Sequence, residues 1–264
     1  MKPFPSIVSS FALLSLCVAT VIANAESDLG REQRLEQEVI AGLFTGEAIK
    51  LPIPDGEFLA VDTEPEGDLK GGVVILHGRG FHPDWPEVVA PLRTQLAESG
   101  WRTLSLQMPV LDKAAKYYDY VPLFPEAFPR IEAGIAYLRD LGVRPIVLVA
   151  HSCGVHMAMA WVRERGEAQI DGFVGIGMGA TDYQQPMMEP FPLAQMRAPV
   201  LDVYGSNEYP AVLRMAPDRL AAIRRAGNPK SRQLTIAGAE HYFRGQEQAL
   251  VSAVREWLDS LLAE

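Results

Sequence analysis

The most constraining feature of this sequence is a buried strand that passes directly into a helix. Residues 146–150 are an apolar, mostly β-branched run, which is typical of a strand inside a parallel sheet. From Cys153 onward the apolar residues recur at helical spacing. The turn falls at Ser152, and the residues two places either side of it, Ala150 and Gly154, are both small. Small residues at these positions let a strand and a helix pass closely at a sharp, strained turn.

Such a turn has a chemical consequence for the residue at its apex. It lifts the Ser152 hydroxyl clear of the sheet and aims the first amides of the new helix at the same place. This strand, turn and helix form the arrangement called a nucleophile elbow, so Ser152 is the candidate nucleophile. Cys153 comes one place later, and we expect its thiol to point into the fold while its backbone amide faces the site.

Strands alternate with helices along the whole chain, which predicts an α/β fold with a mostly parallel sheet and helices on both faces. The predicted strands are residues 57–61, 73–76, 103–108, 146–150, 173–176, 199–204 and 232–237. The predicted helices are residues 26–43, 86–99, 131–141, 153 onward, 211–226 and 246–262. Residues 57–61 alternate like a half-buried edge strand, and residues 113–129 form an aromatic, proline-rich loop.

The first 25 residues have the pattern of a secretory signal peptide. Lys2 supplies a positive charge, residues 7–22 are apolar and uncharged, and small residues end the segment at Ala25. An apolar run of about 16 residues is short of the roughly 20 that span a membrane. A lipoprotein signal at Cys17 would need a small residue before it, where this chain has leucine. We expect one domain over residues 26–264, exported to the periplasm with no stable membrane anchor.

Composition narrows the possible partners. The chain has 24 Lys and Arg against 33 Asp and Glu, a formal net charge of −9, which disfavours nucleic acid and anionic membranes as partners. Without the signal peptide Cys153 is the only cysteine, so we expect no intramolecular disulfide. The sequence has no Cys-x-x-Cys pair, glycine-rich phosphate loop or zinc-ligand spacing, so we expect neither a metal nor a cofactor.

The elbow resembles that of the α/β-hydrolase superfamily, which usually has Gly-x-Ser-x-Gly where this chain begins with Ala150. Three further segments resemble an exported bacterial branch of that superfamily whose function is unknown. They are LHGRGFHPDWPEVVAPLR, GWRTLSLQMP and VLDVYGSNEYP. The resemblance extends from Glu57 to Leu262. It implies an α/β-hydrolase fold in which residues 179–198 form a small cap over an open pocket.

The resemblance also implies the partners of the nucleophile, because the superfamily places nucleophile, acid and histidine in that chain order. His241 follows the last predicted strand and is the implied base. Glu208 fits the superfamily's Gly-x-x-acid pattern after the preceding strand. Asp202, inside that strand, and Asp182, after the strand before it, are the alternative acids.

The implied oxyanion hole consists of two backbone amides, those of Arg79 and Cys153, with Gly80 as the alternative to Arg79. Gly78 and Gly80 would let the backbone approach a bound carbonyl closely. The side chains that could line the pocket come from the aromatic loop and the cap, where they could equally cover a loop core. They are Tyr117, Tyr118, Met187, Met188 and Phe191.

These residues predict a serine hydrolase that cleaves a carboxylic ester or thioester of a small-molecule acyl substrate through an acyl-enzyme on Ser152. Two alternatives stay open from the sequence. One is an acyltransferase, which would use the same residues with an acceptor other than water. The other is a binding or scaffold protein that keeps the fold without the catalysis.

Overall fold

The computed structural model describes residues 26–263, so the predicted signal peptide lies outside the described residues. The strands are β1 (Glu47–Ile53), β2 (Gly56–Thr63), β3 (Gly71–Leu76), β4 (Trp101–Leu106), β5 (Ile146–His151), β6 (Gly172–Ile176), β7 (Val200–Gly205) and β8 (Arg232–Ile236). The helices are α1 (Leu29–Gly42), α2 (Val89–Ala97), α3 (Tyr117–Tyr120), the 3₁₀ helix η1 (Val121–Glu126), α4 (Ala127–Asp140), α5 (Cys153–Arg165), α6 (Pro210–Ala226) and α7 (Glu247–Leu262).

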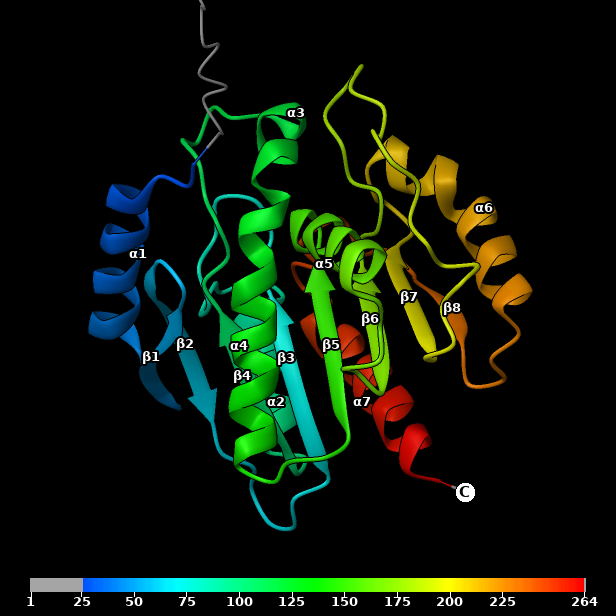
Figure 1. Cartoon of the computed structure of the whole chain (residues 1–264). Coiled ribbons are helices and arrows are strands. Elements are labelled where there is room, and N and C mark those ends of the chain that lie inside the picture. Colours follow the sequence, from blue (N-terminus) through cyan, green and yellow to red (C-terminus); the bar gives the residue numbers. More distant parts are fainter. Residues whose placement is uncertain (1–25, 264) are drawn as a thin grey trace, which may run out of the picture.

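The eight strands form one sheet in the order β1-β2-β4-β3-β5-β6-β7-β8. The β1–β2 and β2–β4 pairs are antiparallel, and every other pair is parallel. Because β4, β3, β5, β6, β7 and β8 are all parallel, their carboxyl ends meet at one edge of the sheet. Open α/β sheets bind ligands at such an edge. The predicted sheet with helices on both faces is confirmed (Figure 1).

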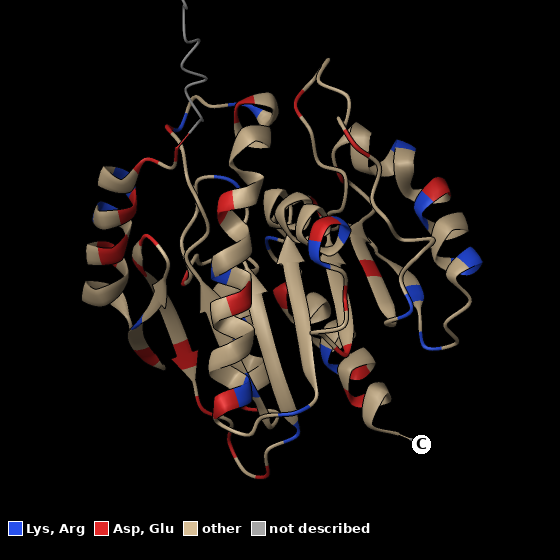
Figure 2. Cartoon of the chain, in the orientation of Figure 1, with Lys and Arg blue, Asp and Glu red and all other residues tan. Residues whose placement is uncertain are grey.

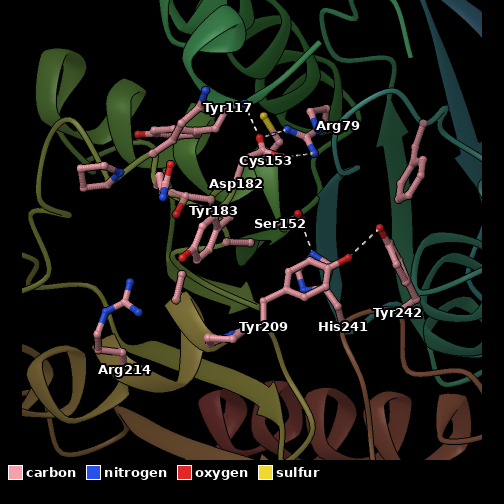
Figure 3. A pocket seen from close by; sticks show the side chains of 18 residues that line it. Arg79, Tyr117, Ser152, Cys153, Asp182, Tyr183, Tyr209, Arg214, His241 and Tyr242 are labelled. Carbon is pink, nitrogen blue, oxygen red and sulfur yellow. Dashed lines mark hydrogen bonds and ion pairs between the residues drawn. The ribbon is translucent and has the colours of Figure 1, made fainter. Parts of the chain in front are cut away.

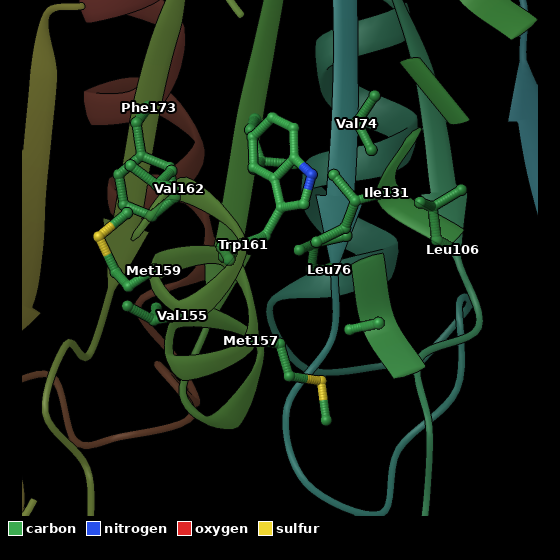
Figure 4. Close-up of a cluster of buried hydrophobic side chains, with 14 of the residues drawn as sticks. Val74, Leu76, Leu106, Ile131, Val155, Met157, Met159, Trp161, Val162 and Phe173 are labelled. Carbon is green, nitrogen blue, oxygen red and sulfur yellow. The ribbon is translucent and has the colours of Figure 1, made fainter. Parts of the chain in front are cut away.

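Each face of the sheet has its own apolar core. On one face α4 and α5 pack on side chains such as Val74 and Leu76 of β3, with Trp161 fully buried among them (Figure 4). On the other face α2 and α7 pack on the alternate residues of β3, Val73 and Ile75. Because side chains alternate along a strand, a strand covered on both faces must be apolar throughout, and all six residues of β5 are buried.

The prediction of an edge strand at residues 57–61 is wrong. The strand there, β2, pairs with β1 on one side and β4 on the other, and its last six residues are buried. The edge strand on this side of the sheet is β1, which a turn at residues 54–55 joins to β2. Alternating apolar residues at 49, 51 and 53, followed by Pro-Asp-Gly, are the hairpin signal that could have revealed it.

The predicted aromatic loop contains helices in the structure, whereas the predicted cap is an irregular loop. Residues 113–129 are not simply a loop, because they contain α3, η1 and the first turn of α4. The cap segment 179–198 contains no helix or strand and crosses the sheet edge as an irregular loop. Charged side chains lie mainly on the helices and connections, and β3 and β5 carry none (Figure 2). Among residues 26–263 no helix combines the length and hydropathy that crossing a membrane requires.

Candidate active site

Ser152 lies at a strained turn between β5 and α5. Its φ of 54° is in the left-handed region, which non-glycine residues occupy at a cost of about 1 to 3 kcal/mol. A Cβ on Gly154 would lie 2.6 Å from the carbonyl oxygen of His77, so only glycine fits where α5 passes the end of β3. The turn is held by the Ser152 amide, which donates to the Ile176 carbonyl at 2.9 Å. The predicted elbow geometry is present.

Ser152, His241 and Glu208 form a hydrogen-bonded row across the carboxyl edge of the sheet. Ser152 Oγ lies 2.8 Å from His241 Nε2 (Figure 3). On the other side of the ring, His241 Nδ1 lies 2.8 Å from Glu208 Oε2 and 3.0 Å from Oε1. A carboxylate only accepts, so Nδ1 carries the proton and Nε2 is free to accept the hydroxyl proton of Ser152. Both His241 and Glu208 are buried.

Two glycines leave the space that Glu208 and His241 need to approach each other. A Cβ on Gly205 would lie 2.2 Å from the Ala239 carbonyl oxygen, where the acid turn passes the histidine loop. At Gly177, just after β6, φ is +62° and a Cβ would lie 2.8 Å from Glu208 Oε1 and 2.9 Å from His241 Cε1. Gly177 is not among the site residues predicted from the sequence. Its position directly after a buried strand was the available signal.

The two alternative acids lie elsewhere. Asp202, fully buried in β7, accepts hydrogen bonds from Arg219 Nε and Gln233 Nε2, both at 2.8 Å. Burial raises the pKa of the Asp202 carboxyl despite the charge of Arg219. Asp182 accepts from the Arg79 guanidinium and, at 2.6 Å, from the Tyr117 amide. Burial opposes its ionisation, but the hydrogen bonds from Arg79 and the Tyr117 amide together with the positive charge of Arg79 outweigh it, and the Asp182 pKa is lowered. Neither carboxylate hydrogen-bonds to His241.

The two residues whose amides are predicted to form the oxyanion hole both line the cavity in front of Ser152. Cys153 is the first residue of α5, and Arg79 lies in the turn after β3. Within residues 26–263 neither amide has a hydrogen-bond acceptor. Unpaired amides beside a nucleophile are suited to hold a developing negative charge. Gly80, the alternative, does not border this cavity, and its carbonyl accepts from Arg31.

The main cavity in front of Ser152 has a volume of about 620 Å³ and is lined largely by residues of the cap loop, the start of α6 and the turns that carry the row (Figure 3). Of the predicted pocket residues only Tyr117 lines it. Met188 and Phe191 line a second cavity of about 400 Å³, which Tyr117 also borders. Four predicted pocket residues line neither cavity. They are Gly78, Gly80, Tyr118 and Met187.

Two tyrosines beside the row were missed. The Tyr209 ring stacks on the His241 imidazole with centroids 4.3 Å apart, and its amide donates to Glu208 Oε2 at 2.9 Å. The Tyr209 hydroxyl lies 3.2 Å from that of Tyr242 (Figure 3). Each tyrosine directly follows a predicted site residue in the sequence, and that adjacency was the signal.

Three other histidines near the turn are structural. His77 bonds through Nδ1 to the Gly78 carbonyl at 2.8 Å and accepts at Nε2 from the Met108 amide at 2.9 Å, which braces the loop of Arg79. His151 bonds through Nε2 to the backbone carbonyl of His241 at 3.0 Å, a support that the sequence analysis missed. Burial lowers the pKa of His77 and of His151 to about 3, and that of His156 to about 4. All three are neutral at neutral pH.

The Cys153 thiol is expected to be inert in the native protein. It is buried, and burial raises its pKa to about 12, so almost no thiolate forms at pH 8. With iodoacetamide at pH 8, mass spectrometry should find Cys153 unmodified in the folded protein and alkylated in urea. Alkylation at equal rates in both samples would contradict the buried position of the thiol.

Known structures share this architecture. The esterase of the hyperthermophilic archaeon Pyrobaculum calidifontis aligns with a TM-score of 0.64 at 14% identity, covering 89% of this chain and 94% of that one. An alpha-beta serine hydrolase homologue from Coxiella burnetii aligns at 0.61 with 19% identity, covering 81% and 98%. Est1E from Butyrivibrio proteoclasticus aligns at 0.61 with 16% identity, covering 83% and 100%. No curated protein matches the sequence.

The sheet order and these alignments define a protein with the α/β-hydrolase fold. Within that class, residues 21–120 and 124–260 match the family described as protein of unknown function DUF3530. The chain belongs to that family.

Proposed function

We propose that this protein is a serine hydrolase that cleaves a carboxylic ester or thioester through an acyl-enzyme on Ser152. The observation that carries the proposal is the row in which His241 bridges the Ser152 hydroxyl and the Glu208 carboxylate at hydrogen-bond distance. Nucleophile, base and an acid that orients the base are the three parts that activate a serine. The hydrolases and esterases among the known structures with this fold support the same reaction class.

The proposed reaction has two halves. Ser152 Oγ attacks the carbonyl carbon while its proton passes to His241 Nε2, and the amides of Arg79 and Cys153 hold the negative oxygen that forms. His241 then returns the proton to the leaving alcohol or thiol, and the acyl group stays on Ser152. In the second half water gives its proton to His241 and attacks the acyl carbon. When that intermediate collapses, the bond between the acyl carbon and Ser152 Oγ breaks and His241 returns the proton to Oγ, which releases the acid and restores the Ser152 hydroxyl.

Labelling with a fluorophosphonate tests the proposal, because this reagent phosphonylates only an activated serine. We expect one adduct on the wild-type protein, mapped to Ser152 by mass spectrometry, and none on Ser152→Ala. Ser206→Ala is a suitable control, because Ser206 lies on the acid turn and, among residues 26–263, its Oγ bonds only to the Gly238 amide. It should label like wild type. A folded wild-type protein without an adduct would favour the scaffold alternative, and acyl transfer to an added alcohol would favour the acyltransferase.

A further inference from the structure

The second cavity is an apolar groove that the proposed chemistry does not use. It lies between α5, the η1 and α4 segment and the cap loop. Its apolar walls are formed by Val121, Phe124, Phe128, Ala160, Met188 and Phe191. The charged side chains that border it include Arg163 and Glu189, which form an ion pair with each other. A groove of this chemistry suits a hydrocarbon chain better than a polar group.

Tyr117 lies where the groove meets the main cavity. Tyr117 lines both, and its hydroxyl accepts a hydrogen bond from the Met188 amide of the cap loop at 3.2 Å. Beside it stands His156, whose ring centroid lies 4.8 Å from that of Tyr117 and 5.1 Å from that of Phe191. Burial lowers the pKa of His156 to about 4, so this neighbour of Tyr117 is uncharged at neutral pH. On the side of the main cavity Tyr117 contacts the Arg79–Asp182 ion pair, where its amide donates to Asp182.

The groove follows α5 away from the elbow. His156 is one turn beyond Ser152, Ala160 is two turns beyond, and Glu164 is three. At a rise of about 1.5 Å per residue, Ala160 lies about 12 Å and Glu164 about 18 Å along the helix from Ser152. The groove is therefore long enough for an extended alkyl chain rather than a short acyl group.

The position of His241 decides which half of an ester enters the groove. His241 Nε2 must reach the leaving oxygen, so the alcohol half lies on the side of His241 and Tyr209. The acyl half then extends to the opposite side, where Tyr117 lies (Figure 3). The lining of the main cavity is polar on both sides, with Tyr209 on the side of His241 and the Arg79–Asp182 ion pair on the side of Tyr117.

We propose that the acyl chain of the substrate runs from Ser152 past Tyr117 into the apolar groove, so that the substrates are esters of long-chain fatty acids. This inference rests on the proposed serine hydrolase function. Burial of a methylene group increases kcat/KM by at most about fourfold. Since the groove is partly open to solvent, we expect kcat/KM to rise about 100-fold from acetyl to dodecanoyl esters.

Two comparisons on the wild-type enzyme test the chain assignment. The first is kcat/KM for 4-nitrophenyl acetate, butyrate, octanoate and dodecanoate, each below its critical micelle concentration. The second compares ethyl dodecanoate with dodecyl acetate, which place the same long chain on the acyl or the alcohol side. We expect ethyl dodecanoate to be preferred at least tenfold. A higher kcat/KM for dodecyl acetate would contradict the placement of the acyl chain in the groove. Equal kcat/KM values for all acyl chain lengths would show that the groove does not bind the substrate.

Two groove-filling variants connect the effect to these residues. Ala160→Phe fills the groove from α5, and Met188→Trp fills it from the exposed rim, where folding tolerates a larger side chain. Each should reduce kcat/KM for the dodecanoate about 100-fold and leave the acetate within twofold. Ala253→Phe, half-buried on α7 at the other face of the sheet, is the matched control and should leave the length profile unchanged.

The two proposals fail in different ways. An unlabelled Ser152 with no ester hydrolysed overturns both of them. A labelled Ser152 with equal rates for all chain lengths overturns only the fatty-acyl inference. Equal losses for acetate and dodecanoate in both filling variants would also overturn it, because a blocked subsite affects only the long chain.

Discussion

Ser152→Ala and His241→Ala are each expected to lower kcat for an activated ester by about 10⁶-fold. Ser152 supplies the bond to the acyl group, and without His241 its proton has no acceptor at 2.8 Å. Because nucleophile and base act as one unit, the double variant should be no slower than either single variant. The measurement is the rate of 4-nitrophenyl butyrate hydrolysis, after purification that removes host esterases.

These variants should fold. Alanine at position 152 keeps the same backbone strain, and the His241 backbone carbonyl still accepts from His151. Thermal unfolding within a few degrees of wild type is the control. If either variant keeps activity within tenfold of wild type, hydrolysis occurs elsewhere on the protein and the proposed mechanism is wrong.

Glu208→Gln is expected to lose activity while keeping its stability, and Asp202→Asn is expected to lose stability while keeping most of its activity. Glu208 accepts from His241 Nδ1, and a glutamine there can donate instead, which favours the tautomer whose Nε2 carries a proton and cannot act as base. A loss of about 10⁴-fold in kcat is the expected size for this change. The unfolding free energy should change little by comparison, since the side chain keeps its shape.

Asp202→Asn should instead reduce stability. Asp202 pairs with Arg219, which is 5% exposed, so the variant leaves a buried guanidinium without its counter-charge. Breaking such a pair by removing one partner costs about 3 to 5 kcal/mol. Urea denaturation measures this loss, and kcat of the folded protein should stay within tenfold of wild type. A large kcat loss in Asp202→Asn with none in Glu208→Gln would identify Asp202 as the acid.

The fold could be predicted from the sequence because a doubly covered parallel sheet leaves a strong pattern. The β5 strand has no polar residue before His151, and the next apolar residues switch at once to helical spacing. The edge strand β1 was harder to predict from the sequence. Only Leu51 of β1 is buried, because an edge strand needs fewer apolar residues, and Pro52 weakens its strand signal.

The row could be located because its members follow strands in a fixed order along the chain. The cavity walls could not, since they depend on how loops meet in space. Tyr118 and Tyr117 are adjacent in the sequence, yet Tyr117 is buried between the two cavities while Tyr118 is 39% exposed. The ion pair between Arg79 and Asp182 could not be predicted either, because the two residues are 103 positions apart in the chain.

The contact between Asp182 and Arg79 also joins the cap loop to the proposed oxyanion hole. Asp182 accepts hydrogen bonds from the Arg79 guanidinium and from the Tyr117 amide at the start of α3. In the proposed reaction the Arg79 amide holds the negative oxygen, so a movement of the cap loop at Asp182 would also shift that amide. We therefore expect entry of the substrate and the chemical step to be coupled through this one contact.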